Sequence, residues 1–278
     1  MTTVYPFNFG LGPLNVTGYG VMMMVAFLLG GWLMTRDLRE RGLRYEYAAD
    51  MTVAAVIGGI VGAKLWYAAA TGDWDSLFSR GGLVWYGGFL GGVAAVLLNG
   101  RRLQVPMRWT MEITAPALAA AYAAGRLGCF MVGDDYGVPS SLPWAVKFPQ
   151  GLPPTTAANL AADFQVAVPE GITPETVLAV HPTQLYEAIL MIAAFMLLWR
   201  LRGHRQGTGW LFGVYLVLAG LERFLVEFVR AKDDRLLAGF TLAQLTALGA
   251  VLMGGLLIAR FRSAGPAPAG PYLSSKPG

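Results

Sequence analysis

The 278-residue chain is 55% hydrophobic and only 14% charged, with a mean hydropathy of +0.50, which excludes an ordinary soluble domain. It is predicted to be an integral membrane protein, and its net charge of +4 implies no nucleic-acid partner. One cysteine, Cys129, and two histidines, His181 and His204, rule out a disulfide framework and argue against a Cys- or His-based metal centre. No metal and no cofactor are predicted.

Seven apolar segments are long enough to cross a bilayer, which takes about 20 helical residues. They are 17–35, 48–70, 83–98, 111–132, 184–201, 208–229 and 240–259. The N-terminus has no basic region, so the first segment is expected to be a retained span and not a secretory signal. Lys and Arg alternate across the connections, thirteen on one side and five on the other. By the positive-inside rule, the N-terminus is therefore predicted to be periplasmic and the C-terminus cytoplasmic.

The predicted fold class is an all-α integral membrane protein with seven transmembrane helices, in a transmembrane domain of residues 1–262. The long connection at 133–180 is predicted to be a periplasmic cap between spans four and five, with a short helix starting at Thr155 or Thr156. Its LPWAVKFP run is expected to be extended. Residues 263–278, rich in Pro, Gly and Ser, are expected to be a disordered cytoplasmic tail.

Charged residues inside the apolar segments are candidate functional groups, because an unpaired charge costs roughly 2.5–3.5 kcal/mol on insertion scales. Arg126, near the end of the fourth span, either snorkels to the interface or is held by Asp134 and Asp135. Arg223 and Glu227 are four residues apart and can pair on one helix face, as a functional pair or as a self-neutralised one.

The loop after span six does not follow the charge pattern, because it places Arg230, Lys232 and Arg235 outside, together with Asp233 and Asp234. Such a departure often marks function.

A polar cluster opens the fifth span in the run VHPTQLYE. His181 precedes the helix, and Gln184, Tyr186 and Glu187 surround its first turn. His181 is either an ordinary interfacial histidine or, with Gln184 and Glu187 beside it, a group for proton handling or head-group binding.

Tyr19 and Tyr86 each lie beside glycine at the outer end of a span, where tyrosine is also common as a membrane-interface residue. Lys64, in the second span, either marks function or extends to the interface.

Three blocks of the sequence resemble the bacterial prolipoprotein diacylglyceryl transferases, in that family's order. GRLGCFMVGDDYGVPSSLPWAVKFP resembles its signature G-R-[IL]-G-N-F-x-N-G-E-x-[YW]-G-x-P-[ST]-x-[LM]-P-W-x-V-x-F-P. VHPTQLYE resembles H-P-[ST]-Q-L-Y-E, and RFLVEFVR resembles R-F-x-V-E-F-x-R. The resemblance covers most of the chain and implies a seven-span protein of the bacterial inner membrane.

The family moves the diacylglyceryl group of phosphatidylglycerol to the lipobox cysteine of prolipoprotein signal peptides and releases glycerol phosphate. The implied partners are therefore phosphatidylglycerol, prolipoproteins and membrane lipids. The residues that match the motifs are Tyr19, Arg126, Gly137, Arg223, Glu227 and Arg230. Arginine suits such a reaction because its guanidinium binds phosphate in a bidentate way.

Combining these patterns, we expect Arg126, Arg223, Tyr86, Tyr19 and Glu227 to be catalytic. The expected substrate-binding residues are Gly137, His181, Gln184, Tyr186, Glu187, Arg230 and Asp134.

The chain departs from the family pattern at two places. Tyr86 stands where the family has the histidine of H-G-G, and Cys129 and Val132 replace the two asparagines of G-N-F-x-N-G. Cys129 is either a small buried hydrophobic residue or a thiol beside Arg126. We expect Tyr86 to take over the histidine's role.

Three alternatives to this activity are weighed. One is a divergent phospholipid-dependent transferase with another acceptor, and a second is a lipid-binding or transport protein whose charges hold an anion. A transporter predicts internal repeats, and none is visible in the sequence. A purely structural helical scaffold, the third, leaves the buried charges unexplained.

Overall fold

The computed structural model describes residues 2–11, 14–79, 82–167, 171–231, 235–237 and 239–275. Its helices are α1 (Gly18–Glu40), α2 (Glu46–Thr71), α3 (Trp85–Arg102), α4 (Met107–Val132), α5 (Ala157–Phe164), α6 (Thr183–Leu201), α7 (Trp210–Val226), α8 (Leu242–Phe261) and α9 (Gly270–Ser274), with 3-10 turns at Asp75–Phe78 and Glu227–Val229. The strands are β1 (Thr2–Thr3), β2 (Asn8–Leu11), β3 (Leu14–Thr17), β4 (Val146–Lys147), β5 (Arg235–Leu237) and β6 (Phe240–Thr241). The fold is helical, and each predicted apolar segment forms a helix.

Five of these helices are long and apolar enough to cross a membrane: α1, α2, α4, α6 and α8. The other two predicted spans are shorter or less apolar. Helix α3 has 18 residues and ends in Arg101 and Arg102, whereas α7 has 17 residues and continues into a 3-10 turn. The chain is therefore a multi-pass α-helical membrane protein.

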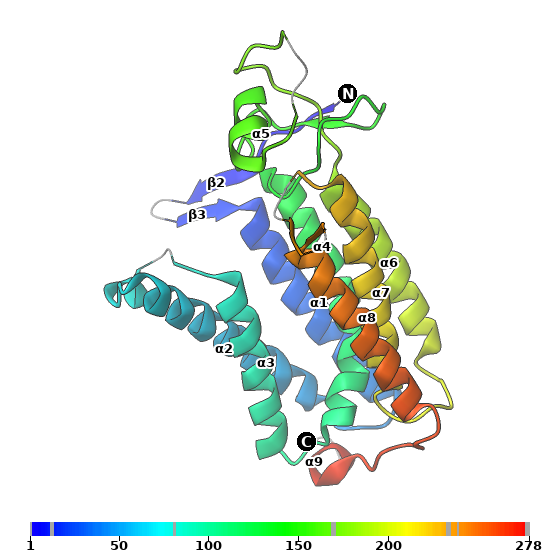
Figure 1. Cartoon of the computed structure of the whole chain (residues 1–278). Helices are drawn as coiled ribbons and strands as arrows, with labels where there is room; N and C mark the ends of the chain where they lie inside the picture. The colour runs from blue at the N-terminus through cyan, green and yellow to red at the C-terminus, as the bar shows by residue number, and fades with distance from the viewer. Residues whose placement is uncertain are drawn as a thin grey trace.

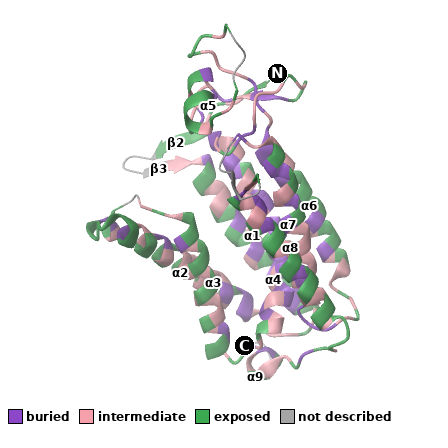
Figure 2. Ribbon diagram, viewed as in Figure 1, coloured by how far each residue is buried: buried purple, intermediate pink, exposed green. Residues whose placement is uncertain are grey.

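Helix α4 is the centre of the bundle, packed between α1 on one side and α6 and α7 on the other. In its most apolar window 56% of the residues are buried, against 11% for α2. Its alanine-rich sequence lets the neighbouring helices approach closely, because small side chains bring backbones together in membrane bundles. The residues of α4 therefore face protein on most sides, and Figure 2 shows the resulting buried core.

Helices α2 and α3 form a hairpin set to one side of the bundle (Figure 1). Their contact runs through glycines: a Cβ added at Gly62 would lie 2.3 Å from the carbonyl oxygen of Gly87, and one at Gly91 would lie 2.3 Å from that of Gly58. No side chain larger than hydrogen fits at these crossings.

The N-terminus and the cap lie at the end of the bundle opposite α9 (Figure 1). Strand β1 pairs in parallel with β4 of the cap, and a small core forms around Tyr136, Phe148 and Leu160. Two predictions for the cap are confirmed: Thr156 caps α5, and β4 falls within LPWAVKFP.

The C-terminal segment differs from the expected disordered tail. Residues 263–275 lie across the end of the bundle, where Leu273 is fully buried and the Arg108 Nη2 and Trp109 Nε1 atoms donate to the carbonyls of Gly265 and Ala267. The Pro- and Gly-rich composition predicts disorder because it offers few side chains to bury. In the structure, however, Leu273 is part of the hydrophobic core and Tyr272 packs against that core. Residues 276–278 lie outside the described residues.

Candidate active site

The end of α4 places a charged loop over the helix. Gly133 ends α4 in the left-handed conformation with a φ of 71°, and Asp135 is also left-handed with a φ of 55°. Aspartate tolerates this conformation better than most residues. The double turn reverses the chain and brings the Asp135 carboxylate to Arg126 on the helix below.

Arg126 is held from three directions. Its Nη1 atom lies 2.8 Å from Asp135 Oδ2, and its Nε atom contacts the carboxylate of Glu187 on α6. Both Nε and Nη2 donate to the Tyr122 hydroxyl, at 3.1 and 3.0 Å, and that hydroxyl donates to Glu187 Oε2 at 2.8 Å. Of the two alternatives for Arg126, the contacts show the one in which a loop acid holds it, and that acid is Asp135.

Two further arginines join the same network. Arg223 Nη2 lies 2.6 Å from Glu227 Oε2, as the spacing of four predicted, and the Thr241 hydroxyl donates to Glu227 Oε1 at 2.9 Å. Arg230 Nη2 lies 2.5 Å from Asp135 Oδ1. Asp135 therefore joins Arg126 to Arg230, and Arg230 Nε lies 3.8 Å from Glu227 Oε2, the partner of Arg223. The three arginines form one cluster at the cap ends of α4 and α7.

The first turn of α6 holds the charged loop through its backbone. The Thr183 hydroxyl donates to the carbonyl of Asp135 at 2.7 Å, and Gln184 Nε2 donates to that of Asp134 at 2.5 Å. Both side chains are fully buried. Gln184 thus has a structural partner, and Glu187, one turn further on, contacts Arg126 directly.

Gly137 has a packing reason to be glycine. A Cβ there would lie 2.4 Å from the Val229 carbonyl oxygen and 2.7 Å from the Cβ of His181. Its N–H donates to the His181 carbonyl at 2.9 Å, which joins the loop to α6. The backbone of Gly137 therefore packs directly against both Val229 and His181, next to the arginine cluster.

His181 and Tyr186 form a second polar group in the cap. His181 Nδ1 lies 3.2 Å from the Tyr186 hydroxyl, which accepts a hydrogen bond from Trp144 Nε1 at 2.8 Å. Burial lowers the pKa of His181 below its ordinary value, so the ring is neutral at neutral pH. None of these contacts reaches an arginine of the cluster.

Tyr19 reaches the cluster and Tyr86 does not. Helix α1 crosses α4 at Gly128, where an added Cβ would lie 3.3 Å from the Cα of Tyr19. The Tyr19 hydroxyl interacts electrostatically with Cys129, Asp134 and Arg126. Tyr86 is half exposed on α3 and its ring packs edge-on against Trp85.

Cys129 is buried one turn beyond Arg126, whose Nη1 atom lies 3.8 Å from its sulfur. The sulfur and one carboxylate oxygen each of Asp134 and Asp135 lie within 4.8 Å of one another. Because Asp135 already pairs with two arginines, this group is a poor cation site.

The pKa of Asp134 is raised to about 6, first by burial and then by the neighbouring Asp135. Asp134 lies beside the arginine cluster, but it is Asp135 that forms the ion pairs with Arg126 and Arg230.

Sequence reasoning missed several residues of the site: Tyr122, Thr183, Thr241 and Glu222. Tyr122 had a signal, since it lies four residues before Arg126 in an alanine run. Thr241 and Glu222 reach the cluster only through tertiary packing. Residues Lys232, Asp233 and Asp234, expected to contribute to the outer loop, lie outside the described residues.

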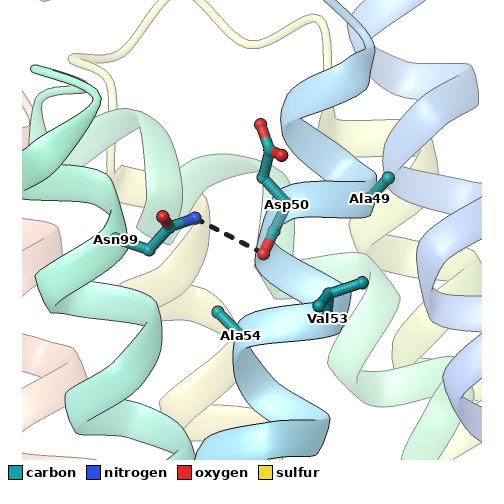
Figure 3. Close-up of a pocket in the computed structure, with 5 residues that line it drawn as sticks. All are labelled: Ala49, Asp50, Val53, Ala54 and Asn99. Carbon is teal, nitrogen blue, oxygen red and sulfur yellow. Dashed lines mark hydrogen bonds between the residues drawn. The ribbon is translucent and has the colours of Figure 1, made fainter.

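Two other features lie away from the cluster. Lys64 donates to the carbonyls of Ser76 and Ser79 at 2.9 and 2.6 Å, which agrees with a side chain that extends to the end of its helix. Figure 3 shows an open pocket near the start of α2, where Asn99 Nδ2 donates to the Asp50 carbonyl at 3.4 Å. Its lining is small and mostly apolar, so it offers no anion site.

Comparison with known proteins gives the family. The family model described as prolipoprotein diacylglyceryl transferase matches residues 6–260. The chain belongs to the prolipoprotein diacylglyceryl transferase family.

Its relatives in this family include several proteins named phosphatidylglycerol–prolipoprotein diacylglyceryl transferase. The one from Nitratidesulfovibrio vulgaris Hildenborough is 31% identical over 90% of this chain and 91% of its own length. Those from Synechococcus elongatus and Solidesulfovibrio magneticus are 31% and 32% identical, over 88% and 92% of this chain and 83% and 94% of their own. The relatives thus match this chain over nearly its whole length.

Proposed function

We propose that this protein transfers the diacylglyceryl group of phosphatidylglycerol to the lipobox cysteine of prolipoproteins, as a bacterial inner-membrane transferase. The observation that carries the proposal is the cluster of Arg126, Arg223 and Arg230 at the outer end of the helices of a chain from this family. A lipid-binding or transport role explains the arginine cluster equally well, but it does not explain why the chain belongs to a transferase family. A purely structural role accounts for neither.

The arginines serve the leaving phosphate. In the reaction the thiol of the acceptor loses a proton, a bond forms between its sulfur and the glyceryl carbon, and the bond from that carbon to the phosphate oxygen breaks. The phosphodiester becomes a phosphate monoester, whose growing charge is stabilised by charge-assisted hydrogen bonds from guanidinium groups. Arg126 and Arg223 are assigned this role, and Arg230 binds the lipid head group.

The acids of the cluster hold the arginines in place before lipid arrives. Glu187 and Glu227 are almost fully buried, so they remain with Arg126 and Arg223. Asp135, whose side chain is 41% exposed, is the acid that gives way to the phosphate. Tyr19 lies beside this point and contacts the glycerol or phosphate oxygens.

The remaining parts of the site are assigned to binding of the acceptor, the prolipoprotein. The cap group of His181, Tyr186 and Trp144 lies on the outer side, where a prolipoprotein signal peptide arrives. Gly137, Gln184 and Asp134 shape the loop between this group and the arginines. We also assign seven membrane spans, with the N-terminus and the cap periplasmic and the C-terminus cytoplasmic, in line with the distribution of Lys and Arg.

Purified protein supplied with phosphatidylglycerol and a lipobox peptide tests the function. Lipidated peptide and glycerol phosphate are expected in equal amounts. A folded protein that gives neither product with phosphatidylglycerol contradicts the proposal, and product formation from phosphatidylcholine alone contradicts the donor assignment.

A further inference from the structure

Glu222 is a buried acid that the proposed chemistry leaves unused. It lies on α7, is only 6% exposed, and its Oε1 atom has no hydrogen-bond partner among the described residues. Burying a carboxylate without a partner is costly in a protein interior and more so in a membrane, so such residues are rare without a function.

Its position is at the seam between three helices. Leu218 and Ala219, one turn earlier on α7, pack with Tyr122 in the core shared by α4, α6 and α7. Glu222 continues this face toward the cluster. It interacts electrostatically with Glu187 on α6, with Arg126 on α4, and with Arg223 and Arg230. Tyr122 and Tyr215 belong to the same core.

The charge of the cluster is already balanced without Glu222. Three arginines contact three acids, because Arg126 pairs with Glu187 and Asp135, and the other two arginines pair with Glu227 and Asp135. Among the described ion pairs Glu222 has none. Ionised, it would add an uncompensated negative charge beside Glu187, at the place where an anionic phosphate has to bind.

We propose that Glu222 is a positioning residue that carries a proton in the resting site, and that its ionisation weakens the hold of the cluster on the phosphate of the lipid donor. Protonated, the carboxyl leaves the three arginines free of excess negative charge. Ionised, it repels the phosphate and competes for the guanidinium groups. The inference rests on the proposed transferase function.

The test is the Michaelis constant for phosphatidylglycerol, measured from about pH 6 to about pH 9 with saturating lipobox peptide. In the wild type this KM is expected to rise about tenfold toward the alkaline end. Glu222→Gln is expected to keep a low KM throughout, changing by less than about twofold, with kcat close to wild type. Glu222→Asp retains the titrating group and is expected to retain the rise.

Two controls separate Glu222 from other acids. Glu175→Gln removes an exposed acid of the cap and is expected to leave the profile unchanged. Asp134→Asn removes the other acid beside the cluster, and the alkaline rise is expected to persist. A structural role alone would lower stability or kcat without removing the pH dependence of KM.

A flat wild-type KM, or a Glu222→Gln variant that repeats the wild-type rise, overturns the proposal. If the wild type transfers nothing, it is the proposed function that fails. In that case quenching of tryptophan fluorescence by brominated phosphatidylglycerol, measured over the same pH range, still tests Glu222. Binding that does not weaken with rising pH then counts against the inference.

Discussion

Arg126 uses its guanidinium in a way that lysine cannot copy. Its nitrogens reach Tyr122, Glu187 and Asp135 at the same time, from two helices and a loop. An ammonium group presents one point of charge, whereas the planar guanidinium has five donors in fixed directions. The network therefore depends on shape as well as on charge.

Arg126→Lys and Arg223→Lys are accordingly expected to lower kcat/KM for phosphatidylglycerol at least tenfold each, about 1.4 kcal/mol of transition-state stabilisation. Transfer to a lipobox peptide measures this. Arg205→Lys, an exposed cation on another loop, is the matched control and is expected to behave as wild type. Wild-type turnover in both cluster variants would show that phosphate recognition here is not bidentate.

Cys129 and Tyr86 are the two departures from the family pattern. Cys129 is buried, and a lipidated thioether there would be a poor leaving group, so Cys129→Ser and Cys129→Asn are expected to keep most activity. If Tyr86 takes over the role of the family histidine, Tyr86→Phe is expected to lose at least tenfold in activity, about 1.4 kcal/mol of transition-state stabilisation. Tyr86 lies on α3, apart from the arginines, so full activity in Tyr86→Phe would show that its hydroxyl has no part in the mechanism.

For Cys129, intact-mass measurement of the protein after turnover shows whether the thiol ever carries lipid.

The raised pKa of Asp134 makes the stability of the folded protein depend on pH. Its folded pKa of about 6 lies above the unfolded value near 3.9, so between these pH values the folded state binds more protons and stability falls as pH rises. Asp134→Asn removes this effect. It is expected to raise the melting temperature in detergent at pH 7.5 by roughly 2–4 °C, the shift for about 1 kcal/mol, and to leave it unchanged at pH 4. An equal gain at both pH values would contradict the assignment.

At the level of the elements, the glycine contact between α2 and α3 is the most restrictive packing in the hairpin. Gly62→Ala is expected to force the helices apart, because the new Cβ would lie 2.3 Å from a backbone oxygen of α3 that cannot rotate away. Reduced yield and a lower melting temperature in detergent measure this. Gly255→Ala on α8, which meets nothing within 4 Å, is the control and should be neutral.

The C-terminal segment ties the hairpin to the bundle. The Tyr272 hydroxyl donates to Asp50 on α2 at 2.5 Å, and Arg44 lies over its ring at 4.5 Å. Tyr272→Ala is expected to lower the free energy of unfolding by about 1–3 kcal/mol, seen as a loss of several degrees in melting temperature. Phe78→Ala, at a ring that is almost wholly exposed, should not change it. Equal melting temperatures would mean that the segment is only loosely attached.

The helices could be predicted from the sequence because each depends on its own run of apolar residues. Arg223 and Glu227 could be paired because a helix fixes residues four apart. Thr241 and the C-terminal segment could not be placed, since no local pattern encodes their partners, and nothing in the sequence indicates that Glu222 is buried without a partner. Asp134 and Asp135 are neighbours in sequence, and only the left-handed turn decides which one faces the arginines.

For the whole molecule, the proposed orientation rests on the distribution of Lys and Arg and can be measured. The only natural thiol is buried, so a single introduced cysteine reports its own side of the membrane. Ser141→Cys in the cap is expected to react with a membrane-impermeant maleimide in intact spheroplasts, whereas Ser263→Cys reacts only after lysis. The opposite pattern would invert the proposed topology.

The pairing of Asp135 with two arginines makes this carboxylate a competitor for any anion that binds the cluster. Any anion that enters must displace a carboxylate that is covalently tethered and therefore present at high local concentration. We therefore expect chloride, which is weakly coordinating, to be a poor competitor for the arginines, and a phosphodiester, which offers several oxygens, to be a better one. In the proposed reaction the same tethered carboxylate is expected to return to the arginines once the monoester product has formed and to help displace it, so Asp135 is proposed to act both as an anion filter and as an aid to turnover.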